Sequence, residues 1–313
     1  MNIYPLPYSI PEEIFLETEK SIINKKFVTS PLIPGKLETY IYDNESDYYQ
    51  MYRESKFGIT HKKYGWDCLR HYEIIANKCI PLFDNLESCP KNTMVTFPRE
   101  LLKEIKVKFY NNKLYDTEYR DYLEKIFDYG KKYLTCEKSA EYVLKKISCN
   151  KKFSDLKILF LSGTIGYRNV NYSRELLAIG MRQLLGTQFI DYPKINILYD
   201  DCKKKHKYVG KGFTYGGRLK DCDINRDNIK DRIQNKEFDF IIYGRVGKKI
   251  KNKIYCDDTI DNLDNLQYWD SVSKVYTKNE IVFIYGGDNS RDIHDPCLQL
   301  HSQHGTCFVR ELE

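Results

Sequence analysis

Apolar and polar positions alternate in blocks along the chain, and these blocks are typical of an α/β protein. Short apolar runs with β-branched residues predict buried strands, and apolar residues spaced by three or four predict helices. A run from Ser55 to Thr60, a helical pattern over 68–77 and a run from Cys79 to Phe83 form a strand–helix–strand unit. Such units bring their strands together in parallel, so we expect a mostly parallel sheet.

Comparable blocks continue through both halves of the sequence. Further helices are expected to begin near Glu12 and at Pro98, and to cover 46–53, 115–134, 137–147, 172–185 and 228–234. Further strands are expected over 39–42, 157–161, 188–191, 195–199, 238–243, 280–285 and 306–309. A polar, lysine-containing connector at 150–155 suggests a domain boundary. We therefore predict two Rossmann-like domains, covering residues 1–150 and 151–313.

A basic loop joins the first strand of the strand–helix–strand unit to its helix. Lys62 and Lys63 precede Gly65, and Asp67 is a favourable N-cap for the helix. A helix N-terminus next to basic side chains favours an anion such as phosphate. The same spacing also fits a solvated basic loop with no ligand, so the pattern alone leaves both interpretations open.

Two residues on this helix extend the phosphate hypothesis. Arg70 can hold phosphate oxygens through two parallel hydrogen bonds. Glu73, one turn further on, could accept hydrogen bonds from ribose hydroxyls. The alternative is an ordinary pair of surface charges three residues apart.

The second half has four loops that follow strands, where ligands of open α/β sheets bind. They cover 162–166, 210–217, 244–247 and 286–288, and their candidate ligand-binding residues are Gly163, Lys211, Gly212 and Arg245. The glycines could instead serve only turns and close packing. Asp288, Asp292 and His294 are the candidate general bases, because a hydroxyl nucleophile needs a group that accepts its proton.

Composition excludes several classes of protein. The 313 residues carry a net charge of +6, which fits phosphate-bearing ligands but is too weak to indicate nucleic acid. The ten cysteines form no Cys-x-x-Cys pair, so we expect reduced thiols and no metal site. The first residues do not match a signal peptide, and no run of about 18 apolar residues predicts a membrane span. We expect a soluble, cytoplasmic protein.

The segments SKFGIT, GWDCLRHYEI and CIPLF together resemble the donor-binding half of exostosin-like glycosyltransferases, densely over about residues 47–105. The nearest versions occur in glycosyltransferase-like proteins of giant viruses and some bacteria. Tyr64 and Lys78 stand where that family usually has glycine. The resemblance implies a sugar-nucleotide site, which we assign to Lys56, Thr60, Lys62, Lys63, Gly65, Asp67, Arg70 and Glu73.

The second half resembles the companion domain of the same proteins, through 191–194, 208–215, 238–244 and 308–312. The resemblance implies a GT-B-like pair of domains in permuted order, with the donor on the first and the acceptor on the second. If the domains keep the family's relative pose, Met1 and Glu313 should lie close together.

The function that follows from the resemblance is transfer of a sugar from a nucleotide-sugar donor to a glycan or glycoprotein acceptor. The resemblance implies an inverting enzyme without an obligatory metal or cofactor, located in the host cytoplasm or the virion if the source is viral. The first alternative is an inactive binding or structural module of the same fold. The second is another nucleotide-using α/β enzyme, such as a sugar-nucleotide epimerase.

Overall fold

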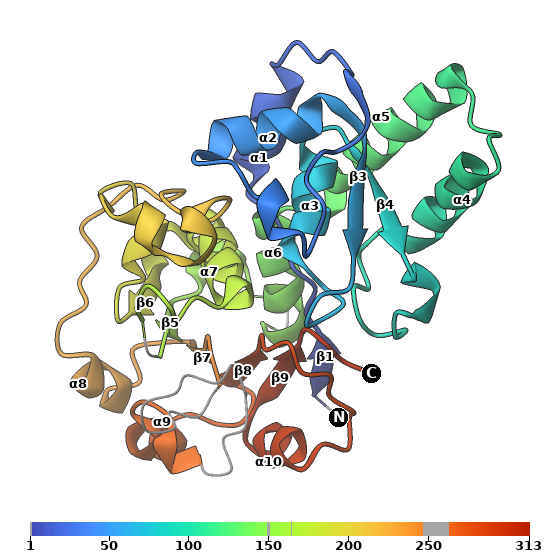
Figure 1. Ribbon diagram of the computed structural model, residues 1–313. Coiled ribbons are helices and arrows are strands. Elements are labelled where there is room, and N and C mark those ends of the chain that lie inside the picture. The colour runs from blue at the N-terminus through green and yellow to red at the C-terminus, as the bar shows by residue number, and fades with distance from the viewer. Residues whose placement is uncertain (1, 149–150, 164, 247–262) are drawn as a thin grey trace.

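Two parallel sheets form the framework of the protein (Figure 1). The computed structural model describes residues 2–148, 151–163, 165–246 and 263–313. The six strands of the larger sheet are β1 (Ile3–Pro5), β5 (Ile158–Leu161), β6 (Phe189–Tyr192), β7 (Phe240–Tyr243), β8 (Ile281–Tyr285) and β9 (Thr306–Val309). The smaller sheet consists of β2 (Phe27–Thr29), β3 (Ser55–His61) and β4 (Ile80–Asp84).

The strand orders are β1-β9-β8-β7-β5-β6 and β2-β3-β4, and each of these strands pairs in parallel with its neighbours. The expected fold class, α/β with two Rossmann-like units of parallel sheet, is confirmed. The helices are α1 (Glu12–Glu19), α2 (Glu45–Arg53), α3 (Leu69–Ala76), α4 (Arg99–Tyr110), α5 (Asp116–Tyr133), α6 (Cys136–Ile147), α7 (Tyr172–Leu185), α8 (Ile229–Gln234), α9 (Trp269–Val275) and α10 (Pro296–His304).

Side-chain alternation along β5 explains why helices cover both faces of the larger sheet. Ile158 and Phe160 belong to the core that includes residues of α6 and α7. Leu159 and Leu161 point the other way, into the core that includes residues of α8, α9 and α10. All four side chains are buried, which is why this strand reads as a continuous apolar run.

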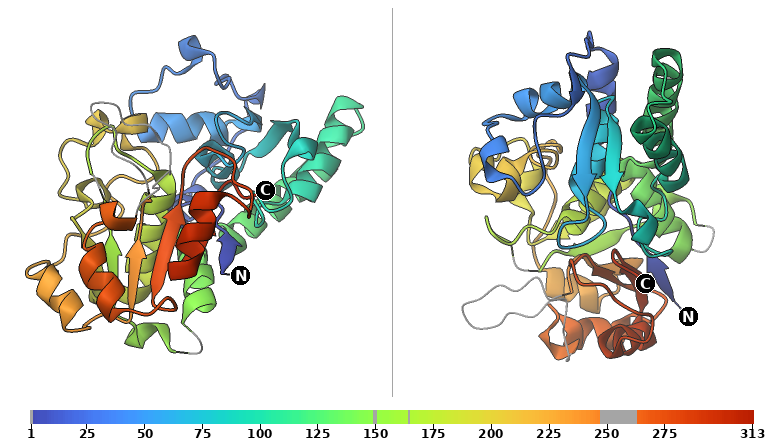
Figure 2. Two further views of the ribbon diagram at one scale, coloured as in Figure 1. Left: turned by 90° about the horizontal axis from the view of Figure 1, so that it is seen from below. Right: turned by 45° about the vertical axis from the view of Figure 1, so that its right-hand side comes forward.

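The two sheets share one core and are not separate globules. A single hydrophobic cluster contains Phe57 and Ile75 next to the smaller sheet and Phe160 of the larger sheet. Helices α6 and α7 pack closely between them, because a Cβ atom at Gly180 would lie 1.9 Å from the carbonyl oxygen of Cys136. Figure 2 shows these helices between the two sheets.

The chain begins and ends in the larger sheet. Strand β1 pairs with β9, and the carbonyl of Asn2 accepts a hydrogen bond of 2.7 Å from the N–H of Cys307. Met1 lies outside the described residues, but the two ends of the chain are neighbours in all views (Figures 1 and 2). A boundary at residue 150 stays a prediction, and the first residues contribute a strand to the sheet that is otherwise built after it.

Three expectations about local structure are wrong. Residues 39–42 and 195–199 form no strand; 3₁₀ turns occupy 37–39 and 196–198 instead. Asp67 does not cap α3, whose N-cap is Cys68. Asn44, one residue before α2, caps that helix by accepting the N–H of Asp47. Within the described ranges, no helix has the length and apolar character that crossing a membrane requires.

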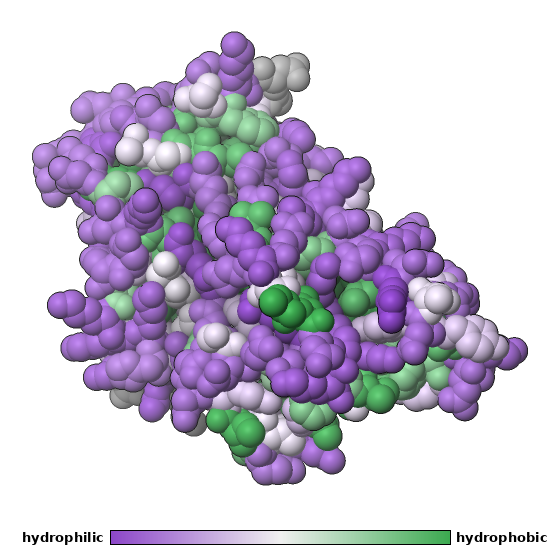
Figure 3. Space-filling view, turned by 90° about the horizontal axis from the view of Figure 1, so that it is seen from above, coloured by the Kyte–Doolittle hydropathy of each residue, from purple (hydrophilic) through white to green (hydrophobic). Residues whose placement is uncertain are grey.

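The surface seen in Figure 3 is mostly hydrophilic, and apolar side chains form small separate patches on it. Single exposed apolar residues of this kind are normal for a protein surface. The feature that stands out is therefore a cavity and not a surface patch.

Candidate functional site

A cavity of about 550 Å³ lies between the two sheets. Its walls come from the loops that follow β3, β5, β8 and β9, together with parts of the segments before α2 and before residue 214. These loops leave the carboxyl ends of parallel strands, the edge at which α/β proteins bind ligands. The volume is in the range of sites for small molecules.

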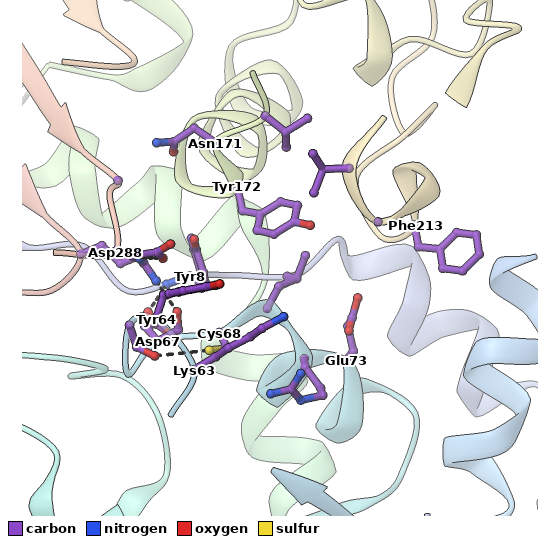
Figure 4. A pocket seen from close by; sticks show the side chains of 18 of the residues that line it. Tyr8, Lys63, Tyr64, Asp67, Cys68, Glu73, Asn171, Tyr172, Phe213 and Asp288 are labelled. Carbon is purple, nitrogen blue, oxygen red and sulfur yellow. Dashed lines mark hydrogen bonds and ion pairs between the residues drawn. The ribbon is translucent and has the colours of Figure 1, made fainter. Parts of the chain in front are cut away.

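Figure 4 shows that the two ends of the cavity differ in chemistry. Asp288, Tyr8 and Asp67 gather at one end, and Glu73 and Phe213 lie at the other. The first end contains charged groups from both sheets. The second end is lined largely by aromatic rings.

The loop after β3 is held by a buried carboxylate from the end of the chain. Glu311 accepts the backbone N–H groups of Trp66 and Asp67, both at 2.9 Å. Its side chain is only 2% exposed. Gly65 makes this contact possible, because a Cβ atom there would lie 2.5 Å from the Glu311 carboxylate. The loop is thus fixed by the second half of the chain.

We expect Gly65→Ala to lower the free energy of unfolding by roughly 1–3 kcal/mol, as overpacking in a tight site does. Urea unfolding followed by circular dichroism measures the change. Gly166→Ala is the matched control, because the nearest atom to a Cβ there is 3.6 Å away. Equal stability of the two variants would mean that the Gly65 contact does not constrain the loop.

Asp67 turns away from the helix that it was expected to cap. Its Oδ2 accepts the backbone N–H of Tyr8 at 2.7 Å, and the carboxyl is buried. Burial raises its pKa to about 7, against the lowering influence of Arg310. Consequently, no side chain caps α3, and Cys68 to Arg70 at its first turn line the cavity.

Arg70 is oriented by a short chain of hydrogen bonds. Its Nε donates to the hydroxyl of Thr60 at 3.2 Å, and that hydroxyl lies 2.8 Å from Nδ1 of His71. The other ring nitrogen of His71 lies 2.9 Å from the carbonyl of Trp66. Burial holds the pKa of His71 well below its usual range, so the ring is neutral. It therefore donates to Trp66 and accepts from Thr60.

This arrangement leaves part of the Arg70 guanidinium without an acceptor. Nη2 is buried and makes no hydrogen bond to any residue that the structure describes. Such a group is costly to leave unpaired, since a buried donor loses its bonds to water. Arg70 lines the cavity next to Lys63, which is exposed. The two cations make this part of the cavity wall positive, which favours an anion there.

Glu73 is already occupied by protein hydroxyls. Its carboxylate accepts the hydroxyl of Tyr48 at 2.6 Å and a short hydrogen bond from Thr214. Burial raises its pKa, and these two hydrogen bonds counteract the rise. Tyr49 also contacts the Thr214 hydroxyl, at 2.7 Å. Glu73 on α3 therefore links α2 to the loop that contains Thr214. To bind a ribose hydroxyl, Glu73 would have to give up its hydrogen bond with Tyr48 or with Thr214.

Two stacked rings mark the aromatic end of the cavity. Tyr48 and Phe213 stack with centroids 5.7 Å apart and both line the cavity. Further rings that line the cavity as a whole belong to Tyr8, Tyr40, Tyr42, Tyr64 and Tyr172. Aromatic surfaces bind nucleobases and sugar rings by stacking.

The structure brings some of the expected site residues together and not others. The cavity is lined by Lys63, Gly65, Asp67, Arg70, Glu73, Lys211 and Asp288. The residues that do not line it are Lys56, Thr60, Lys62, Gly163, Gly212, Arg245, Asp292 and His294. Thr60 lies behind Arg70, and Lys56 pairs with Asp116 on α5. Asp292 and His294 are exposed, and Asp292 accepts the N–H of His294 within their own turn.

Among the residues of the cavity wall that sequence reasoning missed are Tyr8, Arg168, Phe213 and Arg310. Arg168 lies in the loop after β5 and Arg310 directly follows β9, so the rule that favours carboxyl ends of strands could have found both. Phe213 lies in the expected loop 210–217, but its apolar ring was not among the candidates there. Tyr8 carries no such signal, because only the tertiary fold brings its segment to the cavity.

The described residues contain no group of three or more His, Cys, Asp or Glu side chains that could hold a metal ion. Comparison of the chain with protein-family models, with curated proteins and with solved structures finds no match.

Proposed function

We propose that the protein is a glycosyltransferase that transfers a sugar from a nucleotide-sugar donor to a glycan or protein acceptor in this cavity. The observation that carries the proposal is Arg70, which lines a cavity between two parallel sheets and whose Nη2 has no hydrogen-bond acceptor among the described residues. Arg70 lies in the first turn of α3, which no side chain caps. A diphosphate there would receive hydrogen bonds from arginine and attraction from the helix dipole.

The rest of a nucleotide-sugar fits the remaining chemistry of the cavity. The stacked pair of Tyr48 and Phe213 supports binding of a base or sugar ring. Lys63 and Arg168 add positive charge, which would stabilise a leaving diphosphate. Asp288 supplies a carboxylate at the other end for the acceptor hydroxyl. We include inversion and independence of metal in the proposal because the family resemblance implies both.

A second candidate is a binding module that binds a nucleotide-sugar without catalysing its reaction. The two carboxylate oxygens of Glu73 already accept hydrogen bonds from the hydroxyls of Tyr48 and Thr214, so this carboxylate has a structural role. This observation favours the second candidate. Of the three candidate bases, two are exposed outside the cavity, so a catalytic centre would have to depend on Asp288.

Incubation with a panel of UDP- and GDP-sugars distinguishes the two candidates. A transferase is expected to hydrolyse its own donor slowly when no acceptor is present, and the released nucleotide diphosphate can be measured by chromatography. Arg70→Ala, purified in the same way, controls for contaminating hydrolases. Binding of a donor without release of nucleotide would support the binding module. Absence of both binding and hydrolysis across the panel would refute both candidates.

A further inference from the structure

Arg310 connects the two walls of the charged end of the cavity. It is 1% exposed and lines the cavity from the residue that follows β9. One terminal nitrogen, Nη1, donates to the carbonyl of Asp67 in the loop after β3. The other, Nη2, donates to the carbonyl of Gly287 at 2.6 Å and to the carboxylate of Asp288.

The planar guanidinium fixes these partners relative to one another. Its two terminal nitrogens have a rigid geometry, so a loop of the smaller sheet and a loop of the larger sheet are held at a set spacing. Glu311, the next residue, lies 3.1 Å from Nη1 and binds the same loop through Trp66 and Asp67. The ring of Tyr8 lies 4.7 Å from the guanidinium and closes this end.

The carboxylate of Asp288 remains accessible in this arrangement. Its side chain is 44% exposed, whereas the Arg310 side chain is 1% exposed. A buried guanidinium therefore holds one oxygen of an otherwise open carboxylate at the cavity wall. Lys63 and Arg70 line the same cavity as this carboxylate.

We infer that Arg310 is a positioning residue that orients Asp288 as the proton acceptor of the transfer. The inference depends on the proposed function. In the step concerned, the acceptor hydroxyl oxygen forms a bond to the anomeric carbon of the donor. The bond from that carbon to the diphosphate oxygen breaks, the nucleotide diphosphate leaves with the electron pair, and the hydroxyl proton passes to Asp288.

A double-mutant cycle tests this role. Asp288→Asn should lower kcat about 100-fold, in the range of a lost general base. Arg310→Lys keeps the charge but cannot span both walls, and should lower kcat at least 10-fold while the donor Kd changes less than 2-fold. The double variant should be no slower than Asp288→Asn alone, because Arg310 acts through that carboxylate.

Two further variants keep the test decisive. Arg99→Lys is the matched control, since Arg99 also holds backbone carbonyls, those of Pro90 and Thr93, but outside the cavity wall. It should leave kcat unchanged. Asp288→Glu alters only an accessible side chain, so it tests the position of the carboxylate even if Arg310→Lys fails to fold, and it should lose activity nearly as much as Asp288→Asn.

The possible failures are distinguishable. A wild-type protein that turns over no donor would overturn the proposed function, and with it this inference. An active wild type in which the two substitutions have independent effects on kcat would overturn only the role of Arg310. The same holds if Arg310→Lys raises the donor Kd and leaves kcat intact, or if Asp288→Glu is fully active.

Discussion

Asp67→Asn should stabilise the protein at pH 8 and make its free energy of unfolding much less dependent on pH between 4 and 7. The Asp67 carboxyl is fully buried, and burial raises its pKa from 3.8 to about 7. Glu311 raises it further, while Arg310 and the N–H of Tyr8 lower it. The folded state therefore retains a proton on this group where the unfolded chain has already lost it.

The direction of the effect follows from this difference. Between pH 4 and 7 the folded state binds more protons than the unfolded state at this site, so stability falls as pH rises. Below pH 4 both states are protonated and the contribution to stability is complete. Above about pH 7 it is lost. A difference of about three pKa units corresponds to about 4 kcal/mol.

Chemical unfolding of the wild type and of Asp67→Asn at pH 4.5, 6 and 8 measures this effect. Asparagine cannot ionise and keeps an oxygen for the N–H of Tyr8, so the variant should gain on the wild type as pH rises. Asp128→Asn, at an exposed position on α5, is the control and should follow the wild type. A constant difference between wild type and Asp67→Asn over this range would show that Asp67 does not hold the proton.

Arg70→Ala should weaken binding of the nucleotide part of the donor by roughly 1.5–3 kcal/mol, or about 10- to 150-fold in Kd. The loss follows from removal of a charged donor that has no acceptor within the described protein at Nη2. Isothermal titration calorimetry with UDP and GDP measures it. The effect should shrink as salt rises, because ionic attraction at a partly exposed site is screened.

Lys62→Ala is the control for Arg70→Ala. Lys62 belongs to the same basic loop but does not line the cavity, and its Nζ lies 5.0 Å from the ring centre of Trp66. Its replacement should change nucleotide affinity by less than a factor of three. If Arg70→Ala binds UDP or GDP as the wild type does, the anion site lies elsewhere.

Elements with strong local patterns could be predicted from the sequence. Strand β3, helix α3 and strand β4 lie within one or two residues of their expected positions, because each is a buried run or a regular amphipathic repeat. Short β2 was missed, since its pairing with β3 is set by tertiary position and not by its own composition. The apolar residues Ile195, Ile197 and Leu198 suggest a strand over 195–199. Their side chains are buried, but the backbone over 196–198 forms a 3₁₀ turn.

The candidate site was predictable only in part. The basic loop and Arg70 stand out because charge and helix spacing are local properties. The carboxylate of Asp67 accepts the N–H of Tyr8, 59 residues away in the sequence. Rules for helix caps use only neighbouring residues and therefore cannot predict such a contact. Asp292 and His294 follow a strand, as a catalytic group could, but their loop continues past the cavity into solvent. Distances between loops of different sheets cannot be read from spacing along the chain.

The pairing of β1 with β9 has a consequence for synthesis of the protein on the ribosome. Ile3 pairs with Cys307, so β1 cannot pair until β9, far later in the sequence, has been made. The smaller sheet, by contrast, needs only strands from Phe27 to Asp84 and can begin to assemble early. Contacts this distant form late and slowly. Arg310 and Glu311 directly follow β9, so the charged end of the cavity can be completed only after that strand has been made.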